Sequence, residues 1–236
     1  MTLIAARHCL IPSCDVDLPD FERLVKDTAD LPGIGAYKLG FELGLAYGLP
    51  RVVEVARRYT DKPMIYDHQK AATDIPDTGA KFAKVVKKAG INSVILFPQA
   101  GPITEAAWIK ASRDEGLHVM VGGLMTHQGY AASDGGYLSD VGIWNMYRVA
   151  AKAGVRDFVI PGTKPDAIKP LLDELAVLVD HPVYYSPGLG TQGGSFATML
   201  SVVKAPWHPI VGRSLYTATN YREAAQKLIA EFEAAL

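Results

Sequence analysis

The stretch IYDHQKAATDIPDTG, residues 65–79, joins the end of an apolar run to a group of charged side chains. Asp67, Lys70 and Asp74 fall within about eight residues, without the periodicity of a surface helix. Two carboxylates and an ammonium at the end of a buried strand are typical of a barrel whose functional site lies at the carboxyl ends of its strands. The stretch therefore predicts a parallel strand that leads into a charged site.

Similar apolar or β-branched runs recur along the whole chain and alternate with longer amphipathic segments, as in parallel sheets with crossover helices. The predicted strands span residues 10–16, 34–40, 63–68, 93–98, 118–124, 157–162, 183–188 and 209–214. Helical spacing of apolar residues is found near residues 21–25, 52–56, 82–86, 108–109, 146–150, 171–175, 199–203 and 225–232. Eight strand and helix pairs predict an α/β fold, a (β/α)8 TIM barrel. An open doubly wound sheet would normally need fewer strands and a glycine-rich turn after the first, and none follows IPSCDVD.

Composition favours one soluble domain that binds a small molecule. The chain has 236 residues, 49% of them hydrophobic, and no linker or change of composition divides it, so we expect a single domain over residues 1–236. Lys plus Arg (24) nearly cancel Asp plus Glu (25), so we expect neither nucleic acid nor a membrane surface as partner. No leader pattern and no apolar run near about 18 residues is present, which favours a cytoplasmic location. Cys9 and Cys14 lack CxxC or zinc spacing, so we expect reduced, structural cysteines.

Polar side chains fall repeatedly at the predicted strand ends, where they should converge on one barrel mouth. Lys38 is the most informative of them, because it lies between Tyr37 and Leu39, where burial of an ammonium is costly without a carboxylate partner. Asp15 and Asp67, at the ends of the first and third strands, are the expected partners. The full set is Asp15, Lys38, Asp67, Lys70, Thr126, Ser186 and Arg213.

The last two strands are each followed by a loop suited to phosphate. SPGLGTQGG (186–194) is rich in glycine, and VGRSLY (211–216) places Arg213 after a glycine. Glycines let backbone N–H groups approach an anion closely, and an arginine supplies a bidentate contact. Barrels often bind phosphate after their seventh and eighth strands, so these loops predict a phosphorylated substrate.

These segments together resemble the orotidine 5′-monophosphate decarboxylase family, cofactor-free (β/α)8 barrel enzymes of pyrimidine biosynthesis. The resemblance covers most of the chain and rests on YKLGFEL around Lys38, the charged stretch ending in DIPDTG, MTHQG (125–129), SPGLGTQGG and VGRSLY. It implies decarboxylation of orotidine 5′-monophosphate to uridine 5′-monophosphate, without a cofactor or a metal.

The resemblance also implies a role for each matching residue. Lys70 would donate a proton to the carbon that loses carbon dioxide, Asp67 would lie beside the substrate carboxylate, and Lys38 and Asp74 would complete the charge network. Asp15 would hold a ribose hydroxyl and Thr126 would meet the pyrimidine ring. Gln192 and Arg213, with the backbone at Gly193 and Gly212, would bind the phosphate, and Pro187 would belong to the substrate-binding residues. Asp74, Ile75 and Thr78 would reach into the site of a neighbouring copy, which implies a homodimer with shared active sites.

The spacing of the charged stretch departs from the family pattern. The family usually reads DxKxxD, whereas this chain has one extra residue in each gap between Asp67, Lys70 and Asp74. An ungapped match on DIPDTG would place Ala71 at the lysine position, and alanine cannot donate a proton. No other nearby lysine could serve, so we assign the role to Lys70. Asp67 and Lys70 then meet only if the chain bulges or leaves the strand after His68.

Two other functions remain open at this point. A ketose-phosphate decarboxylase or aldolase of the same barrel suprafamily would typically need an acidic residue and a magnesium ion, yet FPQAG (97–101) after the fourth strand offers no carboxylate. A barrel that binds a phosphorylated ligand without turnover would follow if the altered spacing disables the charge network.

Overall fold

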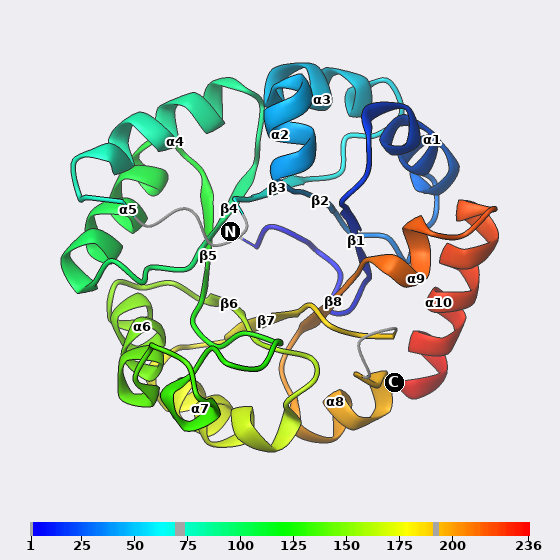
Figure 1. Cartoon of the computed structure of the whole chain (residues 1–236). Helices are drawn as coiled ribbons and strands as arrows, with labels where there is room; N and C mark the ends of the chain where they lie inside the picture. The colour runs from blue at the N-terminus through cyan, green and yellow to red at the C-terminus, as the bar shows by residue number, and fades with distance from the viewer. Residues whose placement is uncertain (1, 69–73, 191–193) are drawn as a thin grey trace.

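The computed structural model describes residues 2–68, 74–190 and 194–236, and these form a closed barrel of eight parallel strands (Figure 1). Each strand pairs with its neighbours in chain order, and β1 pairs with β8 to close the barrel. The predicted (β/α)8 TIM barrel in a single domain is confirmed. The strands are β1 Ile11–Cys14, β2 Tyr37–Leu39, β3 Met64–Asp67, β4 Ser93–Leu96, β5 His118–Gly122, β6 Asp157–Val159, β7 Val183–Ser186 and β8 Trp207–Val211.

Helices surround the barrel on its outside, and Figure 1 shows them as an outer ring. Two connections hold more helix than predicted. A break at Gly48, whose φ of 77° suits glycine, divides the segment after β2, and a short helix precedes the last long one after β8. The helices are α1 Leu18–Thr28, α2 Phe41–Tyr47, α3 Leu49–Arg57, α4 Thr78–Lys88, α5 Pro102–Asp114, α6 Asp140–Lys152, α7 Pro165–Leu178, α8 Phe196–Val202, α9 Arg213–Tyr216 and α10 Tyr221–Ala235, with a 3-10 turn at Ala132–Asp134.

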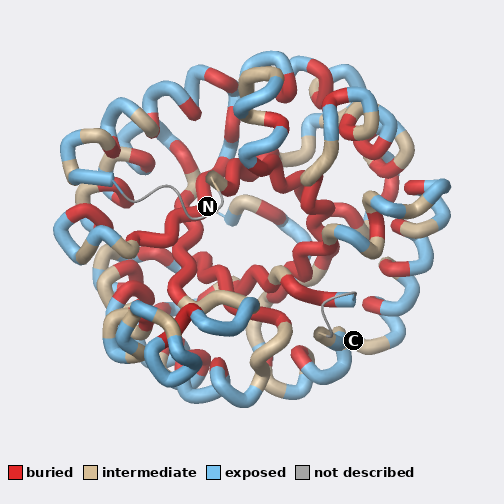
Figure 2. Tube along the Cα trace, in the orientation of Figure 1, coloured by how far each residue is buried: buried red, intermediate tan, exposed pale blue. Residues whose placement is uncertain are grey.

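Alternation along each strand divides the core into two layers. Tyr37 and Leu39 of β2 belong to the larger cluster, which packs the strands against the helices. Ile11 and Ile65 belong to a second cluster inside the barrel. Successive strand residues face opposite sides of the sheet, so one residue in two points into the barrel. Figure 2 shows the buried residues concentrated in the strands and on the inner faces of the helices.

The same alternation corrects one expectation, because Ser186 does not face the barrel mouth. Its neighbour Tyr185 lies in the inner cluster, so Ser186 faces the helices together with Tyr184. Ser186 is fully buried, and its hydroxyl oxygen accepts a hydrogen bond of 2.8 Å from Nε1 of Trp207. A polar residue at a strand end is therefore part of the site only if its position in the alternation points inward.

The amino-terminal segment packs at the end of the barrel opposite the strand carboxyl ends. Ile4 and Cys9 join the inner cluster. Figure 1 shows the amino terminus near the barrel axis, behind the strands. Cys9 and Cys14 are both buried free thiols, as expected. No helix among the described residues is both long enough and apolar enough to cross a membrane.

Candidate active site

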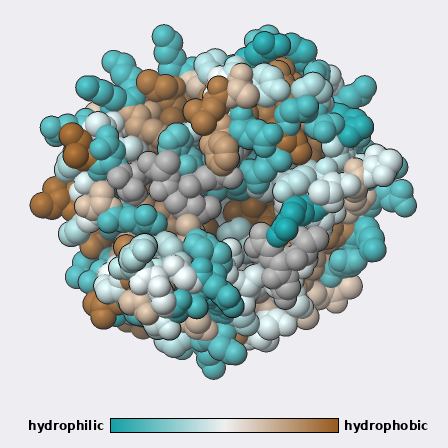
Figure 3. Space-filling view, viewed as in Figure 1, coloured by the Kyte–Doolittle hydropathy of each residue, from teal (hydrophilic) through white to brown (hydrophobic). Residues whose placement is uncertain are grey.

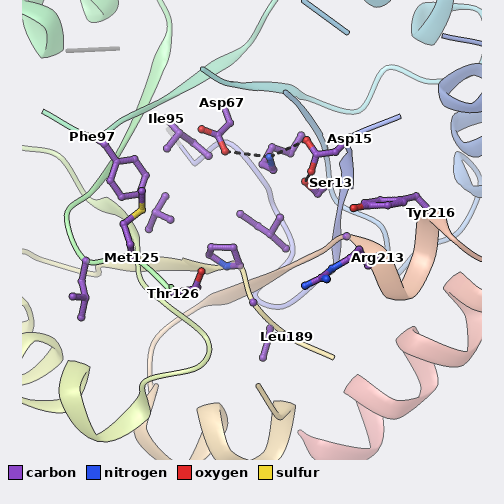
Figure 4. A pocket seen from close by; sticks show the side chains of 17 residues that line it. Ser13, Asp15, Asp67, Ile95, Phe97, Met125, Thr126, Leu189, Arg213 and Tyr216 are labelled. Atoms are coloured by element: carbon purple, nitrogen blue, oxygen red, sulfur yellow. Dashed lines mark hydrogen bonds and ion pairs between the residues drawn. The ribbon is translucent and has the colours of Figure 1, made fainter. Parts of the chain in front are cut away.

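Three neighbouring strands bring a lysine and two aspartates together at the open end of the barrel. Lys38 is in register with Ser13 of β1 and Ile65 of β3. Asp15 and Asp67 each lie two residues further on, at the next inward-facing position. The ammonium Nζ of Lys38 lies 3.1 Å from Oδ2 of Asp67 and 3.8 Å from Oδ1 of Asp15. Dashed lines in Figure 4 mark these contacts at the labelled carboxylates of Asp15 and Asp67, which are the partners expected from sequence.

Burial makes this charge cluster strong. Lys38 and Asp67 are each only 5% exposed. Burial opposes the charge of Lys38, but the attraction of Asp67 and then of Asp15 exceeds that effect, and the pKa of the ammonium is raised above its usual value. Lys38 is therefore protonated at neutral pH, in a site of low dielectric where its charge acts strongly on any bound charge.

Ser13 holds the second carboxylate in place. Its hydroxyl donates a hydrogen bond of 2.7 Å to Oδ2 of Asp15, which leaves Oδ1 toward Lys38. Ser13 lies within β1, one inward-facing position before Asp15, and it lines a cavity at the open end of the barrel. Sequence reasoning examined strand ends alone and missed this residue, although the alternation along β1 would have found it.

The cavity beside the charge cluster has a volume of about 220 Å³. One side is charged and another is apolar, as Figure 4 shows for Ile95, Phe97 and Met125. Figure 3 shows the mouth of the barrel as a hollow, with apolar surface at its centre. Such a cavity suits a flat ring that carries a charged substituent on one edge. The other apolar lining residues are Leu124, Val159, Leu189 and Ile210.

The predicted anion loops border the same cavity. Gly212 and Arg213 line it at the start of α9, and Pro187 lines it after β7. Thr126 lines it from the segment after β5. Figure 4 shows Arg213 and Thr126 across the cavity from Asp67. The arginine is thus placed to hold one end of a ligand whose other end meets the charge cluster. Tyr216 of α9, which sequence reasoning missed, also lines the cavity.

Six predicted site residues are not among those that line this cavity. Lys70, Gln192 and Gly193 lie outside the described residues. Asp74 and Thr78 instead line a shallow groove on the outer surface with Phe82 and Trp108.

Ile75 is likewise directed to solvent, with 58% of its surface exposed. Together with Asp74 and Thr78 it stands on the outside of its own barrel, so these three side chains are available to a neighbouring molecule.

No group of three or more described His, Cys, Asp or Glu side chains has the arrangement of a metal site. Toward the other end of the barrel, Asp157 lies 2.8 Å from Nε2 of His118 and accepts a hydrogen bond of 2.8 Å from the Tyr185 hydroxyl. This second polar group does not line the charged cavity.

The sequence matches one protein-family model over residues 14–228, that of the orotidine 5′-phosphate decarboxylase / HUMPS family. The orotidine 5′-phosphate decarboxylase of Methanosarcina barkeri is 33% identical over 229 residues, which cover 97% of this chain and 96% of that protein. The enzyme of the same name from Methanococcus maripaludis is 28% identical over 204 residues, 86% of this chain and 87% of that protein.

A solved structure gives the same result for the fold. The crystal structure of orotidine 5′-monophosphate decarboxylase from Methanocaldococcus jannaschii, complexed with the inhibitor BMP, superposes with a TM-score of 0.81 at 26% identity. The match covers 95% of this chain and 98% of that one. Sequence and architecture agree over nearly the whole length, and the chain belongs to the orotidine 5′-phosphate decarboxylase / HUMPS family.

Proposed function

We propose that this protein decarboxylates orotidine 5′-monophosphate to uridine 5′-monophosphate, the last step of de novo pyrimidine nucleotide synthesis. One observation supports this function above the others. A buried lysine lies between two carboxylates on one wall of the cavity, and apolar side chains and Arg213 line its other walls. The sequence relatives carry the name of the same activity.

The charge cluster suits the chemistry of carbon dioxide loss. Asp67 beside the substrate carboxylate is repulsive before the reaction, and that repulsion falls when the carbon–carbon bond breaks and carbon dioxide departs. The electron pair stays on the ring carbon, where a neighbouring ammonium stabilises it. Lys70 then gives its proton to that carbon and becomes a neutral amine. Lys38 holds the carboxylate of Asp67 in place through their 3.1 Å contact.

The rest of the cavity holds the nucleotide. Asp15, fixed by Ser13, accepts a hydrogen bond from a ribose hydroxyl. Thr126 meets the pyrimidine ring, which lies against Ile95 and Phe97.

The phosphate binds at the other side of the cavity, at Pro187, Gln192, Gly193, Gly212 and Arg213. Its binding energy, gained far from the reacting carbon, contributes to stabilising the transition state.

Two copies of the chain complete two shared sites. Asp74, Ile75 and Thr78 stand on the outside of their own barrel, and we assign them to the site of the partner copy. Asp74 then joins the charge network across the dimer interface. The protein acts in the cytoplasm, and it requires no cofactor, no metal and no nucleic acid.

The rival activity on a ketose phosphate has less support. Ile95 and Phe97 occupy the inward positions at the end of β4, where the rival would typically need a carboxylate for magnesium.

The test is a spectrophotometric assay of orotidine 5′-monophosphate, with and without a chelator. Equal loss of substrate in both conditions is expected. Turnover of a ketose phosphate that stops with the chelator would support the rival, and binding without turnover would indicate a silent barrel.

A further inference from the structure

The carbonyl oxygen of Ile75 accepts hydrogen bonds from two separate parts of the molecule. Thr78 supplies its hydroxyl at 2.8 Å and its backbone N–H at 3.3 Å, and these bonds close the turn that leads into α4. The indole Nε1 of Trp108, on α5, donates to the same oxygen at 3.1 Å. The Thr78 bonds set the shape of the turn, whereas the Trp108 bond ties the Ile75 carbonyl directly to α5.

The indole of Trp108 is itself held firmly. It is 4% exposed, and its ring lies 4.8 Å, centroid to centroid, from that of Phe82 on α4. A Cβ atom on Gly79 would lie 2.8 Å from the indole Cδ1 and 3.2 Å from the Trp108 Cα. The start of α4 can therefore approach α5 this closely only with glycine at position 79. A buried indole N–H needs an acceptor, and the turn supplies it.

This anchor sets the direction of the exposed residues of the turn. The carbonyl of Ile75 is tied inward to Trp108, while its side chain is 58% exposed. Asp74, the residue before it, is also exposed. A surface that contacts the side chains of Asp74 and Ile75 therefore depends on the position in which Trp108 holds the turn.

We propose that Trp108 is a positioning residue for the active site of a second copy of the chain. It holds the turn at Asp74 and Ile75 where both side chains enter the partner's site. This inference rests on the shared-site dimer of the proposed function. Trp108 itself touches no reacting group.

The first test replaces Trp108 by Phe, which keeps an aromatic ring against Phe82 and removes the N–H donor. Loss of one hydrogen bond costs about 1 kcal/mol, which should lower the equilibrium constant between the productive and the displaced turn about fivefold. Bound substrate restores that position, so KM should rise about fivefold while kcat stays near the parental value. General unfolding would instead lower kcat and leave KM unchanged. Trp144→Phe, at a half-buried indole on α6, is the control and should leave KM unchanged.

A second variant disturbs the same junction from its other side. Gly79→Ala places a methyl group against the indole and should also raise KM, with the turn's own Thr78 bonds intact. If both Trp108→Phe and Gly79→Ala bind substrate with parental KM, the positioning role is wrong.

Mixed dimers test whether the effect crosses the interface. A Trp108→Phe chain retains an intact barrel, whereas a Lys38→Ala chain retains an intact turn. In a mixed dimer, one of the two sites combines the intact barrel of the Trp108→Phe chain with the intact turn of the Lys38→Ala chain. Co-expression of the two chains should therefore raise turnover at low substrate concentration about threefold over that of the two separate preparations combined. If the parent is an active dimer and co-expression gives no rise in turnover, the positioning role of Trp108 is wrong while the proposed decarboxylation stands. A parent that is monomeric or inactive on orotidine 5′-monophosphate would overturn the proposed function as well.

Discussion

Glu105 offers a test of the structure away from the active site. Its side chain lies between α5 and α6 and is 1% exposed, and its Oε1 has no hydrogen-bond partner among the described residues. Burial raises the pKa of this carboxyl from 4.5 to about 8, although a backbone hydrogen bond with Ala150 lowers it in part. The perturbation is Glu105→Gln, which keeps the shape of the side chain and cannot ionise.

The sign follows from comparing the folded and unfolded chains. Above pH 4.5 the unfolded chain releases the Glu105 proton, while the folded chain retains it until the pH reaches about 8. The contribution of Glu105 to the free energy of unfolding is therefore fully present below pH 4.5 and is lost as the pH rises toward about 8. One pKa unit corresponds to about 1.4 kcal/mol, so the parent should lose about 3 kcal/mol relative to Glu105→Gln between pH 5 and pH 8.

Urea unfolding at pH 5, 6, 7 and 8 measures this difference directly. The free-energy curves of the parent and Glu105→Gln should nearly meet at pH 5 and diverge steadily toward pH 8. Glu115→Gln, at the exposed end of the same helix, is the matched control and should run parallel to the parent. Parallel curves for the parent and Glu105→Gln would mean that the Glu105 carboxyl is not buried in its neutral form.

Three further predictions concern Arg213, Ser13 and His208, a buried residue of β8 whose Nδ1 lies 3.1 Å from Sγ of Cys9. Arg213→Ala should raise KM for orotidine 5′-monophosphate about a hundredfold with little change in kcat, and equal KM values would remove Arg213 from the phosphate site. Ser13→Ala should lower kcat/KM about tenfold, because Asp15 loses its fixed orientation. Steady-state kinetics measures this, and Ser93→Ala, at a buried serine of β4, should have no kinetic effect. Burial lowers the pKa of His208 to about 4, so the His208 contribution is fully present above pH 6.5 and is lost toward pH 4. Over that range acid should cost the parent about 3 kcal/mol more than His208→Gln, measured by urea unfolding, and an equal cost would show that His208 is not buried neutral.

The barrel was predictable because its signals are local. Each strand is a short apolar run, and Lys38 between two buried residues already required carboxylate partners from other strands. The pairing with Asp15 and Asp67 followed once strand ends were assumed to meet at one mouth.

The orientation of individual side chains and the contacts between distant segments were harder to predict. Ser186 is polar and lies at a strand end, but its position in the alternation directs it toward the helices and away from the barrel mouth. Ser13 was overlooked within β1 for the same reason. The bond from Trp108 to Ile75 joins residues 33 apart, and the burial of Glu105 arises only when α5 packs on α6. Such long-range contacts leave no periodic signal in the sequence.

If the charge cluster at the open end of the barrel performs the reaction, removal of one of its carboxylates must abolish most of the activity. Two aspartates of similar burial allow a direct test, since Asp67 is 5% exposed and Asp157, toward the other end of the barrel, is 6% exposed. The measurement is kcat/KM for orotidine 5′-monophosphate in Asp67→Asn and in Asp157→Asn, each checked for folding. Asp67→Asn should lose at least about a hundredfold, whereas folded Asp157→Asn should stay close to the parent. Parental turnover by Asp67→Asn, or equal losses in the two variants, would contradict the account.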